Sequence, residues 1–386
     1  MKILRILGSV NPAHGGPIEA MIRSTEVLSR LGHETEVACL DPPGAPWLGG
    51  VGAPVHPFGP GVGRYRFSSA YVAWMERNAG RYDVAVMHGV WNFSSAGAWR
   101  SLRRAGTPYV VFTHGMLDPW FRRAFPIKHA LKDVYWALIE RKVLENAACV
   151  FFTSEDERRL ARSLYPRARY RDAVTPYGTA DAPRPPVGAP GLDADLPALR
   201  GRRYLLFLSR IHPKKGCDLA IRAFAEAAAD HPDLDLVMAG PDEAGWAAEL
   251  RALAASLGVG ARVHWPGMLS GDAKWAAFRG AEAFLLPSHS ENFGIVVAEA
   301  LACGSPVLIT DKVNIWREIE RAGAGLVAAD DQAGAIDLVR RYLALTDPER
   351  AGMRAAARTC FVANFHIEQA AARLADELRA VAAAGR

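Results

Sequence analysis

Residues 283–310 read AFLLPSHSENFGIVVAEALACGSPVLIT, and the order of apolar and polar runs in this stretch predicts the fold class. The apolar run 283–286 has the length of a buried strand and ends at a proline. A polar loop follows, and then an apolar segment long enough for a helix that starts near Gly294. The run 306–310 predicts another strand. A strand, a helix and a strand in this order predict two parallel strands joined by a crossover helix.

The same alternation of short apolar runs and longer helical patterns extends over almost the whole chain. The sequence therefore predicts an α/β fold in which helices cover both faces of parallel sheets. Strands are expected near 2–7, 34–40, 82–88, 108–113, 147–152 and 172–176, and again near 204–209, 234–239, 262–265, 283–286, 306–310 and 325–328. In the first half, helices are expected near 17–31, 67–79, 93–104, 126–145 and 154–163.

Prolines and glycines in residues 182–191 divide this alternation into two parts, because they favour neither helix nor strand. We expect an N-terminal doubly wound, Rossmann-like domain over 1–180, a linker over 181–200 and a second such domain over 201–365. Residues 366–386 have a helical pattern with no strand after it. We expect this C-terminal helix to pack back across the junction of the two domains.

The composition excludes several classes of protein. The 386 residues are 50% hydrophobic and 23% charged, too apolar for a disordered chain, and no uncharged apolar run is long enough to cross a bilayer. A net charge of +5 is too small to indicate nucleic-acid binding. The five cysteines include no Cys-x-x-Cys pair, and the first apolar run is shorter than an export signal. We therefore expect a cytoplasmic protein without disulfides or structural zinc.

Loops that follow strands are the candidate sites, because open α/β sheets bind ligands beyond the carboxyl ends of their strands. After the first strand, Gly15 and Gly16 precede a helix whose amide end can face an anion. The loop matches neither Gly-x-Gly-x-x-Gly nor a Walker A loop, which argues against dinucleotide and P-loop enzymes. A tight turn that needs glycine for its backbone angles is the alternative explanation.

Two cations, Arg210 and Lys215, follow the first strand of the second domain. A planar guanidinium and a mobile ammonium group five residues apart can hold a diphosphate between them. The alternative is that both side chains only decorate the surface, as most basic residues do. Their position directly after a strand favours the diphosphate clamp.

Two carboxylates flank the helix start near Gly294: Glu291 precedes the helix, and Glu299 lies inside it. On one continuous helix, eight residues would separate them by about 12 Å, too far for the carboxylate pair of a retaining glycoside hydrolase. We therefore expect them to contact different parts of a ligand. The alternative for Glu299 is a structural salt bridge, since a carboxylate in an apolar helix needs a donor.

Two histidines, His88 and His114, end strands of the first domain, and each precedes a glycine. A single histidine is more often a structural polar residue than a ligand contact. Their equivalent positions at two strand ends favour ligand contact for at least one of them.

Together these motifs resemble those of the retaining GT-B glycosyltransferases of family four, and the resemblance covers essentially the whole chain. It rests, in chain order, on Gly15-Gly16 with Glu19, Thr113-His114-Gly115, Arg210 with Lys215-Gly216, and Glu291 with Glu299. It implies two Rossmann-like domains that face each other across a cleft. It also implies a nucleotide-diphosphate sugar as the donor and no cofactor.

The resemblance further implies roles for individual residues. Arg210 and Lys215 would hold the donor diphosphate, Glu299 the ribose hydroxyls and His114 the sugar. The implied catalytic set is His114, Arg210, Lys215 and Glu291, and the implied donor-binding set is Gly15, Gly16, Arg210, Lys215, His264, Trp265, Glu291, Asn292, Phe293, Gly294 and Glu299. The sequence departs from the family at Pro176-Tyr177-Gly178, where the family often has Pro-Asn-Gly.

Metal is not needed for such a reaction. The transition state resembles an oxocarbenium ion leaving a nucleoside diphosphate, so cations and amide dipoles near the departing oxygens stabilise it. Arg210, Lys215 and the helix start supply them, and we expect no metal ion. We interpret both Asp-x-Asp pairs, Asp193 with Asp195 and Asp233 with Asp235, as solvated loop acids.

Residues 120–142 combine an apolar stripe with basic side chains. The stripe is Ile127, Leu131, Val134, Tyr135 and Leu138, and the lysines nearby are Lys128, Lys132 and Lys142. We interpret the stripe as core and the lysines as an ordinary solvated face. The alternative is peripheral contact with anionic lipid or a lipid-linked acceptor on the inner face of a membrane.

The sequence thus predicts a cytoplasmic, metal-independent, retaining glycosyltransferase. It would move a hexosyl-type unit from a nucleotide sugar to a hydroxyl of a growing surface glycan or lipid-linked saccharide, as in exopolysaccharide biosynthesis. One alternative is a sugar-nucleotide epimerase of the same fold, which needs an acid and a base near sugar C2 and no acceptor pocket. Another is a non-catalytic nucleotide-sugar binding module.

Overall fold

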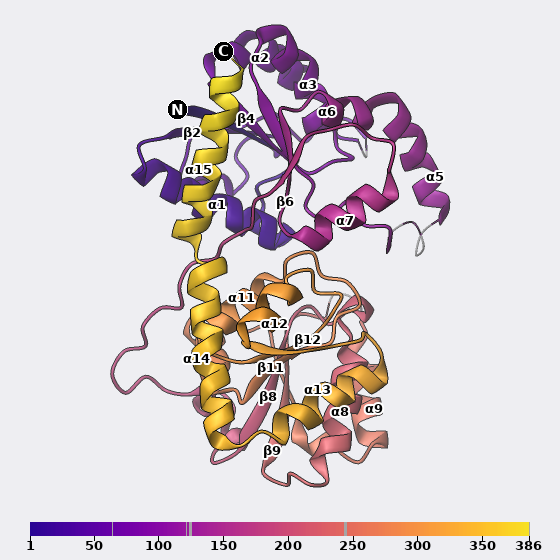
Figure 1. Cartoon of the computed structure of the whole chain (residues 1–386), viewed down its shortest axis with the longest axis vertical. Helices are drawn as coiled ribbons and strands as arrows, with labels where there is room; N and C mark the ends of the chain where they lie inside the picture. The colour runs from indigo at the N-terminus through magenta and orange to yellow at the C-terminus, as the bar shows by residue number, and fades with distance from the viewer. Residues whose placement is uncertain (64, 121, 123–125, 243–244, 386) are drawn as a thin grey trace. The chain divides into compact units, whose positions relative to one another are not determined.

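The computed structural model describes residues 1–385 except 64, 121, 123–125 and 243–244, and it leaves the side chains of 126–129 undescribed. The chain forms two compact units. Unit 1 comprises Met1–Thr179 and Ile367–Arg386, and unit 2 comprises Ala180–His366 (Figure 1). Among the described residues, no helix has the length and apolar character that a membrane span needs.

Unit 1 is built on a seven-stranded parallel sheet in the order β3-β2-β1-β4-β5-β6-β7. Its strands are β1 (Lys2–Leu7), β2 (Glu34–Cys39), β3 (Val55–Pro57), β4 (Val84–His88), β5 (Tyr109–Phe112), β6 (Cys149–Phe152) and β7 (Asp172–Val174). Its helices are α1 (Gly16–Arg30), α2 (Ser69–Asn78), α3 (Phe93–Ala105), α5 (Pro126–Tyr135), α6 (Arg141–Glu145), α7 (Glu155–Leu164) and α15 (Ile367–Ala384).

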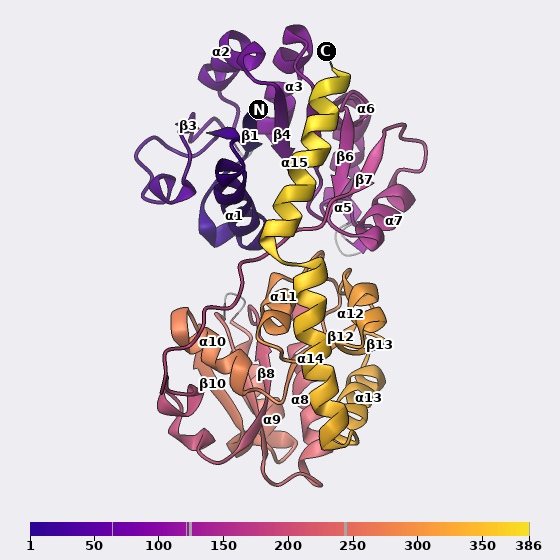
Figure 2. The same ribbon diagram turned by 60° about the vertical axis from the view of Figure 1, so that its left-hand side comes forward.

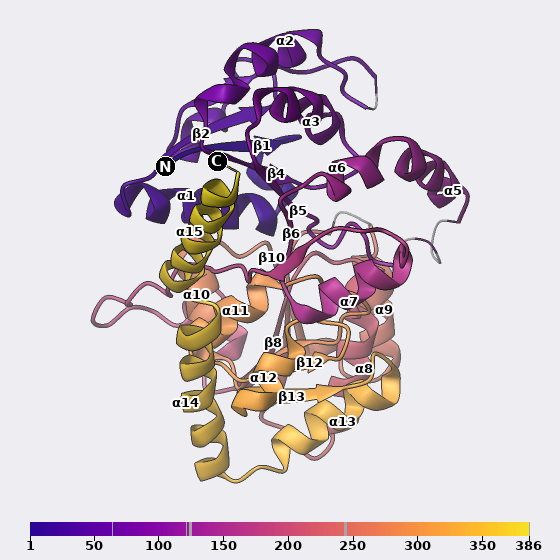
Figure 3. The same ribbon diagram turned by 45° about the horizontal axis from the view of Figure 1, so that its top comes forward.

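Unit 2 is built on a six-stranded parallel sheet in the order β10-β9-β8-β11-β12-β13 (Figure 3). Its strands are β8 (Arg203–Leu208), β9 (Leu234–Ala239), β10 (Val263–Gly267), β11 (Ala283–Leu286), β12 (Val307–Thr310) and β13 (Gly325–Ala328). Its helices are α8 (Cys217–Ala228), α9 (Ala247–Ser256), α10 (Gly271–Gly280), α11 (Ile295–Ala302), α12 (Trp316–Ala322), α13 (Gln332–Leu343) and α14 (Asp347–Asn364). The two-sheet α/β architecture predicted from the sequence is confirmed.

The central strands are buried along their whole length, as the continuous apolar runs predict. Every residue of β4, β5, β6, β9, β11 and β12 is buried. Helices on both faces of a parallel sheet exclude water from it, which is why these strands do not alternate between apolar and polar residues. The core of each unit therefore lies on both sides of its sheet.

Each sheet contains a point at which the chain changes the direction in which it adds strands. In unit 1 this point lies between β1 and β4, and in unit 2 it lies between β8 and β11. The loops that follow two such strands diverge to opposite faces and leave a crevice at the carboxyl edge of the sheet. The loop from Gly8 to Gly15 follows β1, and the loops with Lys215 and Glu291 follow β8 and β11.

The C-terminal helix α15 belongs to unit 1, where it lies beside α1 (Figures 1 and 2). Ile367 and Ala371 pack against Val27 of α1, and Glu368 forms an ion pair with Arg30. The backbone at Gly178 comes so close that a Cβ atom there would lie 2.6 Å from the Cα atom of Ile367. The preceding helix, α14, packs on α11 and α12 of unit 2.

Three sequence-based expectations are wrong in detail. Strand β3 was not expected, and the single helix expected over 126–145 is interrupted by a π-helical turn at Trp136–Glu140. Asp235 is not a solvated loop acid: it is buried in β9, and Arg202 donates two hydrogen bonds to its carboxylate, at 2.6 and 2.7 Å. The ion pair with Arg202 offsets the free-energy cost of burying the Asp235 carboxylate. No pattern along the sequence indicates Arg202 as this partner.

The apolar stripe of residues 127–138, interpreted above as core, is largely exposed. Leu131, Val134 and Leu138 have 72%, 59% and 63% of their surface exposed. Helical spacing of apolar residues shows that they share one face, but not that the face is covered. Residues 121 and 123–125 and the side chains of Ile127 and Lys128 lie outside the described part of the chain.

A buried carboxylate, Glu157 of α7, fixes the turn after β5. It accepts hydrogen bonds from Thr113 Oγ1 and the Gly115 amide, both at 2.6 Å, and from the amide and hydroxyl of Thr153, both at 2.7 Å. Four hydrogen-bond donors therefore stabilise the negative charge of one buried carboxylate. The turn that carries His114 is therefore rigid.

We expect Glu157→Gln to destabilise unit 1 by about 2–3 kcal/mol, because one carboxamide oxygen cannot accept all four hydrogen bonds. The measurement is urea denaturation followed by circular dichroism. Glu155→Gln is the matched control: Glu155 lies in the same turn of α7 but in a half-exposed ion pair with Arg158, so its replacement should change stability by less than about 0.5 kcal/mol. Equal effects of the two substitutions would contradict the role of Glu157.

Candidate functional site

The loop after β8 is held in shape by its own backbone and by the loop after β11. His212 caps the short 3₁₀ turn Pro213–Lys215, and its Nδ1 accepts a hydrogen bond from the Lys214 amide at 3.0 Å. The Lys214 carbonyl accepts hydrogen bonds from the His289 amide and from Ser288 Oγ, both at 2.9 Å. These two bonds fasten the loops to each other beside the switch point of the sheet.

Lys215 lies in this junction with only 8% of its surface exposed, and its Nζ contacts Glu291 Oε2. Burial, followed by the nearby positive charges of Lys214 and Arg210, lowers the pKa of Lys215 from 10.5 to about 7. The contact with Glu291 acts in the opposite direction and favours the ammonium form. Arg210 is exposed at the edge of the loop. The positive charge of Arg210 is one cause of the lowered pKa of Lys215, and their joint contact with a diphosphate stays a prediction.

The backbone of Glu291 is hydrogen-bonded to the backbone of the loop that follows β12. Its amide donates to the Lys312 carbonyl at 2.9 Å, and its carbonyl accepts from the Asn314 amide at 3.0 Å. Gly294, three residues later, is the N-cap of α11, and its φ of +73° is in the left-handed region. A Cβ atom at Gly294 would come within 3.1 Å of Glu291 Cγ. A side chain there would therefore crowd Glu291, which accounts for the glycine.

Asn292 and Phe293 complete the turn into α11. Phe293 is buried, and its ring packs edge-on against Phe365 with 5.7 Å between ring centroids. Its side chain therefore belongs to the core of unit 2, and contact of Phe293 with a donor stays a prediction. Asn292 is half-buried. The first amide groups of a helix generally lack an acceptor in a preceding turn, and the helix dipole there favours an anion.

Glu299 is buried inside α11, and Lys274 of α10 donates a hydrogen bond to its Oε1 at 2.8 Å. The sequence indicated that this carboxylate needs hydroxyls or a basic partner, and the structure supplies the basic partner. As the sequence predicts, Glu291 precedes α11 and Glu299 lies inside it. Contact of Glu299 with a ribose stays a prediction.

His264 and Trp265 lie in β10, and each side chain already has a partner within unit 2. His264 Nε2 lies 2.7 Å from Asp235 Oδ2, next to Arg202. The ring of Trp265 is covered by the guanidinium of Arg251, 4.9 Å from its centroid. The side chain of His264 therefore belongs to the cluster of charged groups around the buried carboxylate of Asp235. Contact of either residue with the donor stays a prediction.

The glycine loop of unit 1 forms a turn and then a helix start. Gly15 has a φ of +84°, and its amide donates to the Pro12 carbonyl at 2.9 Å. Its amide is thus used within the turn, as the alternative explanation of this loop requires. Gly16 begins α1, where the first amides of a helix have no intrahelical acceptor. An anion at this loop would meet the Gly16 amide rather than that of Gly15.

His114 adopts a φ of +53°, an uncommon conformation for a residue with a side chain. Its ring stacks on His88 and on Tyr177, with centroid distances of 5.3 and 5.5 Å. His114 Nε2 lies 3.2 Å from His88 Nδ1, and its Nδ1 contacts the Tyr177 hydroxyl. Burial lowers the pKa of His114 to about 3 and holds the pKa of His88 well below its ordinary value, so both rings are neutral. Strained backbone held by surrounding contacts is common at functional sites.

Sequence reasoning missed three residues that position these side chains. Glu157 holds the turn of His114, Tyr177 contacts its ring, and Lys274 pairs with Glu299. Tyr177 alone had a signal in the sequence, since it occupies the position at which the chain departs from the Pro-Asn-Gly pattern. In the described part of the chain, no group of three His, Cys, Asp or Glu side chains is arranged to hold a metal ion.

Two family models match the chain. Residues 193–359 match "Glycosyl transferases group 1", and residues 15–178 match "Glycosyl transferase 4-like domain". The D-inositol 3-phosphate glycosyltransferase of Thermobispora bispora is 31% identical over 314 residues, which cover 77% of this chain and 70% of the relative. That of Rhodococcus erythropolis is 27% identical over 337 residues, which cover 81% and 72%.

Solved structures share the fold at lower sequence identity. HepE of Anabaena in complex with UDP has a TM-score of 0.78 at 18% identity, with 98% of this chain and 100% of that chain covered. The sucrose-phosphate synthase of Thermosynechococcus elongatus has a TM-score of 0.78 at 21% identity, with 99% of each chain covered. These likenesses show the GT-B fold.

Gly216 provides a test of the loop geometry. A Cβ atom at this residue would lie 2.0 Å from the Pro287 carbonyl oxygen, whereas one at Gly201, which has a similar φ, would meet nothing within 4 Å. We expect Gly201→Ala to cost about 1–2 kcal/mol through its backbone angles alone. Gly216→Ala should cost at least about 2 kcal/mol more, since the two loops must separate. Thermal unfolding of both variants checks this, and similar melting temperatures would contradict it.

Proposed function

This chain belongs to the GT-B glycosyltransferases of family four, and from this membership we propose that it transfers a hexosyl-type unit from a nucleotide-diphosphate sugar to a hydroxyl acceptor with retention of configuration. The observation that carries the proposal is the buried contact of Lys215 with Glu291 at the junction of the β8 and β11 loops. A cation held there, beside a helix start, suits a diphosphate.

In the proposed reaction, the bond between sugar C1 and the diphosphate oxygen breaks, and a bond from the acceptor oxygen to C1 forms. Negative charge grows on the departing oxygen as positive charge grows on the sugar ring. Lys215, Arg210 and the first amides of α11 stabilise that negative charge, and they are already in place before the reaction. We assign the sugar hydroxyls to Glu291. Because these groups come from the chain itself, we propose that no metal ion takes part.

The diphosphate also explains why a lysine is buried here. Burial penalises the charge of Lys215 in the free protein, where the carboxylate of Glu291 contacts its ammonium group. An arriving diphosphate supplies two or more negative charges and raises the pKa of Lys215 again. The binding energy of the nucleotide thus includes the relief of an unfavourable charge. We assign the ribose to Glu299, with Lys274 holding its carboxylate.

We propose that His114 contributes to transfer rather than to nucleotide binding. Both of its ring nitrogens have partners within unit 1, His88 and Tyr177. A hydrogen bond to a sugar hydroxyl therefore requires the exchange of one of these partners. The neutral ring can either donate or accept at the nitrogen that is released.

For the acceptor, we propose a lipid-linked or surface glycan, approached by the exposed face of α5 and the turn that follows it. Leu131, Val134 and Leu138 are exposed there beside Lys132 and Lys142. An apolar stripe with basic neighbours suits an anionic lipid surface. A second candidate is a phosphorylated inositol, because relatives that are 27–31% identical are named D-inositol 3-phosphate glycosyltransferases.

A ligand and acceptor panel tests the proposed function. A nucleoside diphosphate and the corresponding nucleotide sugars should raise the melting temperature. A ligand present at 100 times its dissociation constant should add about 2.7 kcal/mol to the free energy of unfolding. Transfer should then proceed in the presence of a metal chelator, and NMR of the product should show the donor's anomeric configuration. Lipid-linked saccharide and inositol phosphate are offered separately as acceptors. Lys215→Met should lose both the stabilisation and the transfer.

Other outcomes of this panel overturn the proposal. Conversion of the donor to a stereoisomer without acceptor would identify an epimerase. Stabilisation without turnover on any acceptor would identify a binding module. Transfer to inositol phosphate alone would replace the proposed acceptor by the second candidate, and loss of transfer in chelator would contradict metal independence.

The two glutamates should separate by their effects on donor and nucleotide affinity. Glu299→Gln should weaken the nucleoside diphosphate and the intact donor alike, by about 10- to 150-fold, because both carry the ribose. Glu291→Gln should lower the ratio of donor affinity to nucleotide affinity, since only the donor has sugar hydroxyls. This ratio cancels any effect that Glu291 exerts on both ligands through Lys215.

Calorimetry of both variants with both ligands measures these affinities. Lys274→Met is the control for Glu299, because it removes the ion pair but keeps the carboxylate. If Lys274→Met and Glu299→Gln lower stability equally and neither changes nucleotide affinity, Glu299 is only a structural salt-bridge residue. An unchanged affinity ratio in Glu291→Gln would contradict its assignment to the sugar.

A further inference from the structure

Glu140 ends the π-helical turn Trp136–Glu140 of unit 1, and its side chain is completely buried. Among the described residues, the only hydrogen bond to its carboxyl group comes from the Trp91 amide, which donates to Oε2 at 3.3 Å. Oε1 is buried without a partner. Glu157, the other buried carboxylate of this unit, accepts from four donors. Burial with a single long hydrogen bond is unfavourable for a charged carboxylate, and it indicates a neutral carboxylic acid.

The surroundings of Glu140 supply no compensating charge from its closest neighbours. Burial raises its pKa from 4.5 to about 8, against the smaller opposing effect of the Trp91 amide. Two charged side chains border the aromatic rings around it: Lys132 Nζ lies 5.2 Å from the centroid of the Trp91 ring, and Asp133 accepts from the Tyr165 hydroxyl at 2.9 Å. The titratable side chains that interact with Glu140 itself are tyrosines from four segments, and burial raises the pKa of each: Tyr65, Tyr109, Tyr135 and Tyr165.

Trp91 connects Glu140 to the turn that carries His114. Its φ of +68° is in the left-handed region, an uncommon conformation for a residue with a side chain, and its amide is bonded to Glu140. Its indole Nε1 donates to the Met116 carbonyl at 3.0 Å. Met116 lies two residues after His114. The backbone of Trp91 is thus held by Glu140, and its side chain holds the turn after β5.

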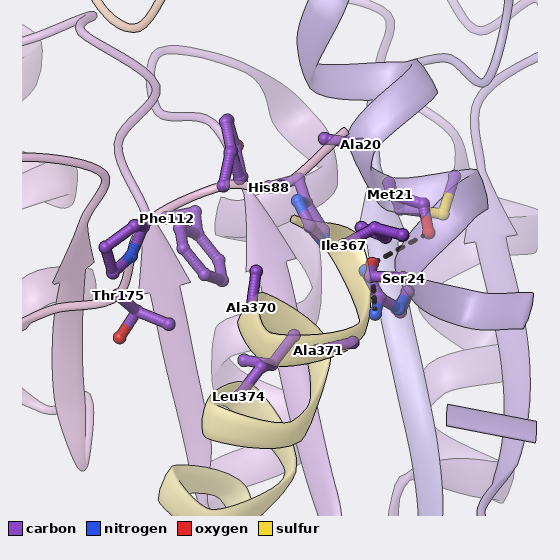
Figure 4. A pocket seen from close by; sticks show the side chains of 14 residues that line it. Ala20, Met21, Ser24, His88, Phe112, Thr175, Ile367, Ala370, Ala371 and Leu374 are labelled. Carbon is purple, nitrogen blue, oxygen red and sulfur yellow. Dashed lines mark hydrogen bonds between the residues drawn. The ribbon is translucent and has the colours of Figure 1, made fainter. Parts of the chain in front are cut away.

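The loops after β4 and β5 start side by side, which makes this connection short. His88 and Phe112 are opposite each other at the ends of the two strands, and their rings stack with 5.6 Å between centroids (Figure 4). A Cβ atom at Gly89 would lie 3.1 Å from Met116 Cε. His114 Nε2 lies 3.2 Å from His88 Nδ1. A displacement of Met116 would therefore change the surroundings of both histidines.

We propose that Glu140 is a positioning residue for His114: as a neutral acid it holds the backbone of Trp91, and the indole of Trp91 in turn holds the turn after β5. Loss of the proton leaves an unpaired charge among aromatic rings and releases Trp91. All these contacts lie within unit 1. The inference rests on the proposed function only where it concerns transfer, to which it assigns an alkaline limit.

The proton of Glu140 also links the stability of the chain to pH. The folded chain keeps this proton up to about pH 8, whereas the unfolded chain loses it near pH 4.5. Between these values the folded chain binds more protons, so the free energy of unfolding falls as pH rises. Glu140→Gln is neutral at every pH. The melting temperature of the wild type relative to that of Glu140→Gln should therefore fall from pH 4.5 to 8, and a difference that is constant or rises would overturn the proposal.

NMR of the full chain tests the connection itself. The indole Nε1–H resonance of Trp91, assigned by its absence from Trp91→Phe, should shift with a midpoint near pH 8. Ring resonances of His114 should follow with the same midpoint, although burial lowers its own pKa to about 3 and keeps it neutral throughout this range. Glu140→Gln should abolish both shifts, and Trp91→Phe should abolish that of His114. The wild-type titration needs no variant, so the test remains valid if Glu140→Gln does not fold.

Glu145→Gln is the matched control. Glu145 lies five residues further along, in a part-exposed pair with Arg141 at 3.7 Å, and its replacement should leave both titrations unchanged. An indole resonance of Trp91 that is constant from about pH 6 to 9, or a His114 ring that does not follow it, would overturn the proposal. Equal titrations in Glu140→Gln and Glu145→Gln would overturn it as well.

Transfer gives a further readout. The ratio of the wild-type kcat to that of Glu140→Gln should fall above about pH 8, approaching tenfold for each further pH unit, because only the protonated form holds Trp91. The KM for the nucleotide sugar should not follow this trend. A kcat ratio that does not change with pH would contradict the positioning role. Linked titrations of Trp91 and His114 in a chain that transfers to no acceptor would contradict the proposed function instead.

Discussion

Parallel pairing of β8 with β11 is the constraint on which the candidate site depends. These strands are neighbours in the sheet but are separated in sequence by two other strands, so their loops leave from one edge in opposite directions. Hydrogen bonds from the His289 amide and from Ser288 Oγ to the Lys214 carbonyl then close the gap between the loops. Lys215 is buried by that closure and would be an ordinary exposed lysine without it. The charge pairing with Glu291 follows from topology rather than from any local preference.

Most of the architecture could be predicted because parallel sheets produce simple sequence patterns. Strands buried on both faces appear as continuous apolar runs, and β1, β9 and β11 coincide with the runs expected for them. The order of loop motifs also carries information, because loops after strands meet at one edge. Arg210, Lys215 and Glu291 could therefore be assigned to one neighbourhood before their distances were known.

The remaining features depend on partners that are distant in sequence. Asp235 could not be recognised as buried, because its neutralisation requires Arg202 and His264 from other elements. Lys274 as the partner of Glu299 is a contact of the same kind. The exposed face of α5 gave the opposite error, since an apolar stripe shows which residues share a face but not whether anything covers it. The backbone strain at His114 is likewise invisible until the turn held by Glu157 is seen.

The assignment of α15 to unit 1 has a consequence for how the chain is synthesised. Unit 2 is continuous in sequence, whereas unit 1 is assembled from both ends of the chain. During translation, residues 1–179 emerge early but lack the helix that covers α1. Unit 2 can thus complete its fold on the ribosome before unit 1 does. The segment that is synthesised first therefore exposes the apolar surface that α15 covers until residues 367–384 have also been synthesised.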